Sequence, residues 1–124
     1  MLIALWILAA LLTVGAVAVG TLKIARPKSA LKAAGMDWTD DFSPAAIKGI
    51  GVLEIVGGAG VILPLATGIL TFLTPIAASC LVVVWIGAAV THVRRREPFA
   101  AVAPSLVLAV LAATTAVIGY VYVL

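Results

Sequence analysis

Charge is scarce in this sequence. Only 10% of its 124 residues are charged, whereas 65% are hydrophobic, and the mean hydropathy is +1.29. A soluble domain of this length carries far more charge, and so few polar residues cannot cover a hydrophobic core in water. The composition therefore excludes a water-soluble domain and predicts an integral membrane protein.

Metal ligands and reactive side chains are almost as rare. The chain has one cysteine, Cys80, and one histidine, His92. These are too few for a zinc or haem site of the usual ligand number, and a single cysteine cannot form an intrachain disulfide. The glycines of 49–60 fall inside an expected helix, so they do not form a phosphate-binding loop. We therefore expect no metal, no cofactor and no autonomous redox enzyme.

Four apolar stretches are each long enough to cross a bilayer, which takes about 20 residues as a helix. The first has no Lys or Arg before Lys23, unlike the basic start of a signal peptide, and we interpret it as a transmembrane helix. Ser43 as N-cap and Pro44 at the first helical position begin the second, and Pro75 predicts a bend in the third. The expected helices cover about residues 1–22, 44–63, 68–92 and 99–123.

The basic residues indicate how this single transmembrane domain (1–124) is oriented. Four crossings place loops 23–43 and 93–98 on the same side, and every Lys and Arg lies on that side. The turn at 64–67 and both ends of the chain carry no charged side chain. By the positive-inside rule, the two loops face the cytoplasm, which also accounts for the net charge without nucleic acid. The fold prediction is an all-α, four-helix transmembrane bundle with its N and C termini on the non-cytoplasmic side, multi-pass in a bacterial plasma membrane.

Loop 23–43 combines charged residues with large apolar ones. Met36, Trp38 and Phe42 stand among lysines and aspartates, and such side chains favour the headgroup layer of a membrane. Ser29 to Ala34 can form a helical turn lying on the membrane surface. The loop is either a solvated connector with aromatic anchors or a flap over a cavity that opens on this side.

Glu54 is a carboxylate in the middle of an apolar helix. At 1.5 Å per residue it lies about 15 Å deep, where a charge costs about 2.5–3.5 kcal/mol on insertion scales. It must therefore face the interior of the bundle, either as a structural hydrogen-bonding group or as a site that handles a ligand or a proton. The candidate hydrogen-bond partners at similar depth are Thr13, Ser79, Thr114 and Thr115.

Small residues surround Glu54 on its helix. Gly51, Gly57 and Gly58 lie three or four residues away and so share its face. They permit close contact with another helix, or they leave a cleft beside the carboxylate.

Polar groups also gather where the third helix ends. His92, with Trp85 on roughly the same face, either caps the helix or lines the mouth of a cavity that contains Glu54. The basic residues near this surface orient the chain, and the alternative role is contact with anionic lipid headgroups. They are Arg94, Arg95, Arg96 and Lys48.

Several of these residues together resemble a known family. Lys48-Gly49, then Glu54, then the glycines of 57–60 and Pro64 are similar to the second helix of DoxX-like membrane proteins. Pro75-Ile76-Ala77-Ala78 and the run Thr91 to Glu97 fit the same family. The resemblance implies a small four-helix bundle with recurring polar positions at Glu54 and His92. It also implies, from the quinol-oxidase subunit behind the family name, an accessory and non-catalytic role beside a membrane oxidoreductase.

The functional hypothesis is an accessory membrane protein that holds a lipophilic ligand, a quinone or a lipid, in a cleft beside Glu54. Membrane lipids are the expected surroundings, with a homodimer or a larger membrane complex as the assembly. One alternative is a structural or assembly subunit, or chaperone, whose Glu54 pairs with another protein's helix. A small proton-coupled transporter is the other. The residues assigned to the ligand site are Glu54, Gly51, Gly57, Gly58, His92 and Trp85.

Overall fold

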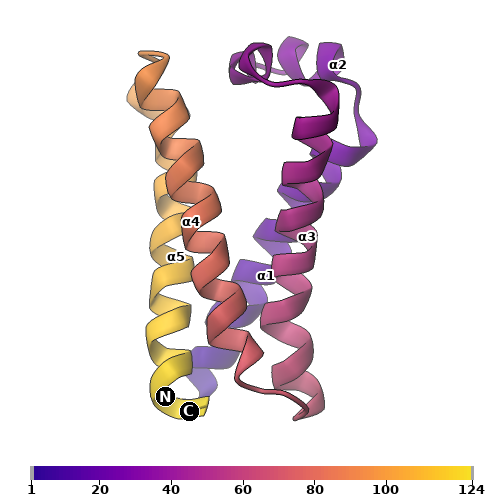
Figure 1. Cartoon of the computed structure of the whole chain (residues 1–124). Helices are drawn as coiled ribbons and strands as arrows, with labels where there is room; N and C mark the ends of the chain where they lie inside the picture. The colour runs from indigo at the N-terminus through magenta and orange to yellow at the C-terminus, as the bar shows by residue number, and fades with distance from the viewer. Residues whose placement is uncertain (1, 124) are drawn as a thin grey trace.

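The chain is helical, as the sequence predicts. The computed structural model describes residues 2–123, and within them no strand occurs. Four of the described helices are long and apolar enough to cross a membrane. They are α1 (Leu2–Ala25), α3 (Pro44–Thr67), α4 (Leu73–Arg94) and α5 (Phe99–Val123). The start of α1 and the end of α5 lie at the same end of the bundle (Figure 1), and the face of the membrane that they meet stays a prediction from the charge pattern.

The connection between α1 and α3 forms a cap over the other end of the bundle (Figure 1). We use "the cap" for residues 26–43, which include the short helix α2 (Lys28–Ala33) and the 3-10 helix η1 (Asp37–Asp41). The turn between α4 and α5 lies at the same end. All the basic residues of the chain are therefore gathered near one end of the molecule.

Local signals explain where the helices begin and end. The Ser43 hydroxyl accepts a hydrogen bond from the N–H of Ala46 at 3.1 Å, and Pro44 occupies the first position of α3, as expected for this start. The helix continues past the expected residue 63 and stops at Gly68, which adopts a left-handed conformation with φ of 70°. Because α4 begins only at Leu73, Pro75 falls in its first turn. A proline there loses no helical hydrogen bond, so the expected bend is not required.

The helices associate as two pairs. Helices α1 and α3 lie together, as do α4 and α5, and the pairs meet through α3 with α4 and through α1 with α5. Figure 1 shows the pairs close together at the end of the chain termini and spread apart beneath the cap. The bundle is thus tightly closed at one end and open at the other.

Small residues let the helices approach one another closely. Without a hydrophobic driving force between helices in lipid, close backbone contact supplies much of the attraction. A Cβ atom on Gly51 would lie 2.7 Å from the carbonyl oxygen of Gly20, and one on Gly57 would lie 2.6 Å from Cδ2 of Leu81. Alanine makes up much of the buried core, which consists of Ala9, Leu12, Ala16, Val61, Ala78, Leu81, Trp85, Ala109, Ala112 and Ala116.

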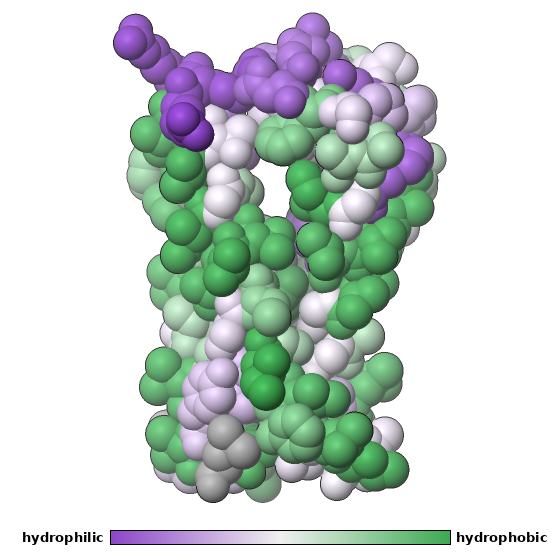
Figure 2. Space-filling model, viewed as in Figure 1, coloured by the Kyte–Doolittle hydropathy of each residue, from purple (hydrophilic) through white to green (hydrophobic). Residues whose placement is uncertain are grey.

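The surface is divided in the way that a membrane protein requires. Figure 2 shows an apolar surface over most of the height of the bundle and hydrophilic residues gathered at the cap end. An opening lies between the two helix pairs, just below the hydrophilic end (Figure 2). The surface around it is mostly apolar or near neutral in hydropathy (Figure 2).

The contact between Gly20 and Gly51 predicts a sharp difference between two neighbouring glycines. Gly51→Ala should destabilise the bundle by about 1–3 kcal/mol, because the added methyl meets a backbone oxygen that cannot move aside. Gly49→Ala is the matched control: its Cβ meets nothing within 4 Å, and alanine favours a helix by about 1 kcal/mol. Thermal unfolding in detergent should rank Gly49→Ala at or above the native chain and Gly51→Ala well below it. Equal unfolding temperatures for the two variants would contradict this description of the α1–α3 contact.

Candidate functional site

A cavity of about 550 Å³ lies between the two helix pairs, beneath the cap. All four long helices and the cap contribute to its wall. Most of the lining side chains are apolar, including Val19, Ile50, Leu53 and Leu108. A cavity of this size and character is typical of small-molecule sites, which measure about 300–1,000 Å³ and combine apolar walls with a few polar groups.

The polar groups on the wall centre on Glu54, which is 1% exposed. Its Oε1 atom lies 2.6 Å from Nζ of Lys23, and its Oε2 atom accepts a hydrogen bond from Nε1 of Trp85 at 2.9 Å. The Lys23 side chain is 12% exposed, and Trp85 is buried. Each oxygen of this carboxylate therefore has a donor, and its charge is balanced within the bundle.

The expected partners of Glu54 were wrong. Among the described residues, the hydroxyls of Thr13, Ser79, Thr114 and Thr115 bond instead to backbone carbonyls, and Ser79 also bonds to Tyr120. Lys23 was missed because the first helix was expected to end before it. Helix α1 continues to Ala25, and helical side chains point back toward the N-terminus of their helix. The Lys23 side chain is therefore directed into the membrane layer, where Glu54 lies.

The buried ion pair explains how the fold tolerates Glu54. A lone carboxylate inside a bilayer is costly, whereas a paired and hydrogen-bonded one is offset by its partners. A lysine ammonium has three N–H groups, so contact with one carboxylate oxygen leaves Lys23 with further donors. Lys23 also lies 5.8 Å from the ring centroid of Trp38 in the cap, within cation–π distance. The cluster joins α1, α3, α4 and the cap at one point.

His92 lies on the same cavity wall, toward the basic end. Its Nδ1 atom pairs with Oε2 of Glu97, which follows the end of α4. The structure thus brings Glu54, Trp85 and His92 to one cavity, with Trp85 next to Glu54 rather than at the entrance. Thr91 and Ser105 add hydroxyl groups to the wall.

The other residues assigned to the ligand site lie elsewhere. Gly51 and Gly57 touch α1 and α4, and a Cβ on Gly58 would lie 3.2 Å from Cβ of Ala16. None of these three glycines is on the cavity wall. Of the two possibilities left open by the sequence, close helix contact is what the structure shows for them.

The cap covers the cavity with apolar side chains. Met36, Trp38 and Phe42 all line it, and the rings of Trp38 and Phe42 pack edge to face with centroids 5.6 Å apart. Lys28 Nζ donates to the carbonyl of Phe42 at 2.8 Å. The segment therefore has the position of a flap over the cavity, one of the two interpretations of loop 23–43.

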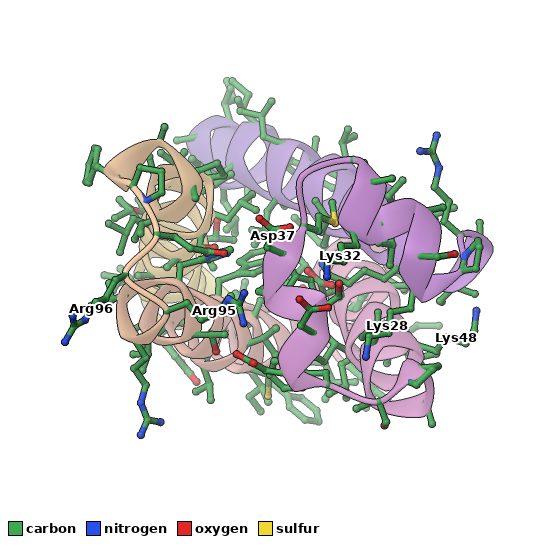
Figure 3. The ribbon with its side chains drawn as sticks, turned by 90° about the horizontal axis from the view of Figure 1, so that it is seen from above. Lys28, Lys32, Asp37, Lys48, Arg95 and Arg96 are labelled. Carbon is green, nitrogen blue, oxygen red and sulfur yellow. The ribbon has the colours of Figure 1, made fainter. Side chains whose placement is uncertain are left out.

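Ion pairs hold the cap in place. Within it, Lys32 Nζ lies 2.9 Å from Asp40 Oδ2, and this hydrogen bond lowers the pKa of Asp40 and raises the pKa of Lys32. Arg95, just after α4, reaches Asp41 at 2.8 Å and also contacts Glu97. Figure 3 shows Arg95 beside the cap and Arg96 directed away from the bundle. The pair between Arg95 and Asp41 connects the cap of one helix pair to the end of the other.

The part of the chain that the structure describes contains no set of metal ligands. Within residues 2–123, no group of three or more His, Cys, Asp or Glu side chains is close enough to hold a metal ion. The site offers instead an ion pair, an indole N–H and hydroxyls facing an apolar space. Such a set can orient the polar end of an apolar molecule.

Comparison with known proteins identifies a family. The family model for the DoxX-like family matches residues 7–115, which cover the cap, all of α3 and α4, and most of α1 and α5. No curated protein and no solved structure gives a significant match.

The ion pair between Lys23 and Glu54 predicts how the stability of the bundle changes when one charge or both charges are removed. Glu54→Gln leaves the Lys23 charge buried without a counter-charge, so it should destabilise the bundle by about 3–5 kcal/mol. The double variant Lys23→Met/Glu54→Gln removes both charges, keeps similar volume, and retains an amide oxygen for Trp85. Thermal unfolding in detergent should therefore place the double variant above the single one. A double variant less stable than Glu54→Gln would show that the charges do not depend on each other.

A second prediction concerns the contact that holds the cap. Asp41→Asn should weaken the pair with Arg95, and a surface pair contributes about 0.2–1 kcal/mol. Amide hydrogen exchange in residues 36–43 should accelerate up to about fivefold. Asp37→Asn is the matched control, because it makes the same change in η1 and Asp37 has no ion-pair partner among residues 2–123. Equal acceleration in both variants would contradict a specific role for the Arg95–Asp41 contact.

Proposed function

This chain belongs to the DoxX-like family, and from that membership and its cavity we propose that it binds a lipophilic ligand with a polar end inside the membrane. A quinone or a lipid has this chemistry. In the proposal the protein is a non-catalytic accessory component that retains the ligand for a membrane oxidoreductase. The apolar body occupies the space between the helix pairs, and the polar end meets the cluster of Lys23, Glu54 and Trp85.

The observation that supports this proposal most directly is the position of the ion pair. Lys23 and Glu54 both lie on the wall of the 550 Å³ cavity. A purely structural pair is most stable when protein surrounds it completely, because empty space beside it provides neither dispersion contacts nor hydrogen bonds. A ligand oxygen can accept a hydrogen bond from one of the remaining N–H groups of Lys23. The rest of the ligand then fills the empty space.

The cavity also has a path to the bilayer. Leu53 and Val83 line it, and these residues are 58% and 72% exposed. They belong to α3 and α4, which spread apart beneath the cap (Figure 1), and the surface is open between the two pairs at this level (Figure 2). A ligand dissolved in the membrane can therefore enter sideways while the cap shields the cavity from water.

The alternative of an assembly subunit places Glu54 against another protein's helix. Glu54 is 1% exposed, and its two oxygens are bound by Lys23 and Trp85 of the same chain. This arrangement supports ligand binding over pairing with an external helix. A transporter requires a cavity that opens alternately to the two sides of the membrane. Nothing in the geometry of residues 2–123 favours this alternative.

Ligand binding is tested with a short-chain benzoquinone that carries an isoprenoid tail. Trp38 and Trp85 line the cavity, so bound quinone should quench tryptophan fluorescence of the purified protein in detergent. The double variant Lys23→Met/Glu54→Gln should bind at least about tenfold more weakly, since a hydrogen bond to a charged group contributes about 1.5–3 kcal/mol. The same titration with diacylglycerol, followed by native mass spectrometry, tests the lipid form of the proposal.

A cavity-filling substitution tests the location of the site and has a matched control. Gly87 lies on the cavity wall and has nothing within 4 Å of a Cβ atom, so Gly87→Leu should remove binding while the fold is kept. Gly49 has the same free space but is not on that wall, so Gly49→Leu should bind normally. If Gly87→Leu and the double variant both bind as well as the native chain, the cavity is not the site.

A further inference from the structure

A second cavity lies on the outer side of α1 and α3, at the basic end of the bundle. Its volume is about 530 Å³, and it is separate from the cavity that contains Glu54 except for Lys23, which borders both. Its ionisable lining residues are all basic: Lys23, Arg26, Lys28 and Lys48. Ser29 and Ile47 are also part of the wall.

Hydrogen bonds to backbone carbonyls hold two of these lysines in place. Lys48 Nζ donates to the carbonyl of Ile24 at 2.7 Å, near the end of α1, where carbonyls lack helical partners. Lys28 Nζ donates to the carbonyl of Phe42 at 2.8 Å. Each ammonium has three N–H groups, so both retain donors for an anion. Figure 3 shows Lys28 and Lys48 on the same side of the molecule.

Most of the charge of this group is not balanced within the part of the chain that the structure describes. The carboxylates that form ion pairs within residues 2–123 bind Lys23, Lys32, His92 and Arg95. Arg26, Lys28 and Lys48 have no carboxylate partner in the same part of the chain. The cavity therefore presents three uncompensated cations around a space that an anion can occupy.

An apolar track continues from this cavity along the membrane-facing side of α3. Val52 and Val56 follow Lys48 at intervals of four residues, so the three lie on one helix face. The two valines are 49% and 62% exposed. An anion bound at Lys48 would thus lie directly above surface that acyl chains can cover.

We propose that this basic cavity binds the phosphate of an anionic phospholipid, with the acyl chains along Val52 and Val56. Basic pockets beside transmembrane helices are suited to lipid headgroups, and charge-assisted hydrogen bonds from Lys and Arg to phosphate are strong. The site is independent of the ligand in the Glu54 cavity. Of the four basic residues expected to contact headgroups, Lys48 belongs to this site. Arg94, Arg95 and Arg96 lie outside it.

Native mass spectrometry of the purified protein tests this site. The protein is delipidated in detergent and offered equal amounts of phosphatidylglycerol and phosphatidylcholine, and the ratio of the bound lipids is measured. The native chain should retain phosphatidylglycerol preferentially. Arg26→Gln/Lys48→Gln should reduce that preference at least tenfold, because each charge near the surface contributes about a factor of five.

Two further variants separate a site from general electrostatics. Arg94→Gln/Arg96→Gln makes the same change in net charge at exposed residues outside the cavity, and the preference should change less than twofold. Arg26→Lys/Lys48→Arg keeps both charges and should restore the preference. Arg26→Gln alone, which removes no hydrogen bond formed within the described residues, should reduce it about fivefold even if the double variant is unstable.

Other results would overturn the proposal. Equal loss in the Arg26/Lys48 and Arg94/Arg96 variants would mean that net charge alone attracts the lipid. No preference in the native chain would mean that the cavity does not select a charged headgroup. Displacement of phosphatidylglycerol by an equal concentration of inorganic phosphate would identify a site for free phosphate, in which the track along Val52 and Val56 has no role.

Discussion

The ion pair between Lys23 and Glu54 is the constraint on which the arrangement of this bundle depends. A carboxylate this deep in a membrane needs a counter-charge, and Lys23 provides it across the α1–α3 contact at 2.6 Å. Trp85 binds the other carboxylate oxygen from α4, so the same carboxylate also joins the two helix pairs. The cap is attached next to this point through Trp38, which faces the Lys23 ammonium.

Different interactions stabilise the two ends of the bundle. Toward the end of the chain termini, glycine and alanine let the helices touch, as where Gly60 of α3 meets Ala77 of α4, and dispersion stabilises the close contact. At the basic end the helix pairs spread apart (Figure 1), and the space between them is covered by the cap and its contact with Arg95. The tight end positions the helices, and the open end provides the two cavities for which we propose a lipophilic ligand and a lipid headgroup.

Much of the fold could be predicted from particular residues. Hydropathy and the Ser43-Pro44 start defined the membrane helices, because a helix in lipid must satisfy its own backbone. The position of Glu54 in the middle of α3 indicated that it faces inward. The glycines beside it were compatible with either a cleft or close contact, and periodicity alone cannot distinguish these. Lys23 was not recognised as its partner, although its place in the last turn of α1 and the direction of helical side chains were a usable signal.

The sequence by itself determined that this chain is a four-helix membrane protein of the DoxX-like type, with its basic residues gathered at one end. These properties depend on local composition and on the order of residues along each helix. Only the tertiary structure decided which groups meet: Lys23 and Trp85 at Glu54, Arg95 at Asp41, and around the outer cavity three cations that have no carboxylate partner within residues 2–123. The reason is that these contacts join residues from different helices. Their distances depend on how closely the glycines allow those helices to approach, and no periodicity within a single helix records that spacing.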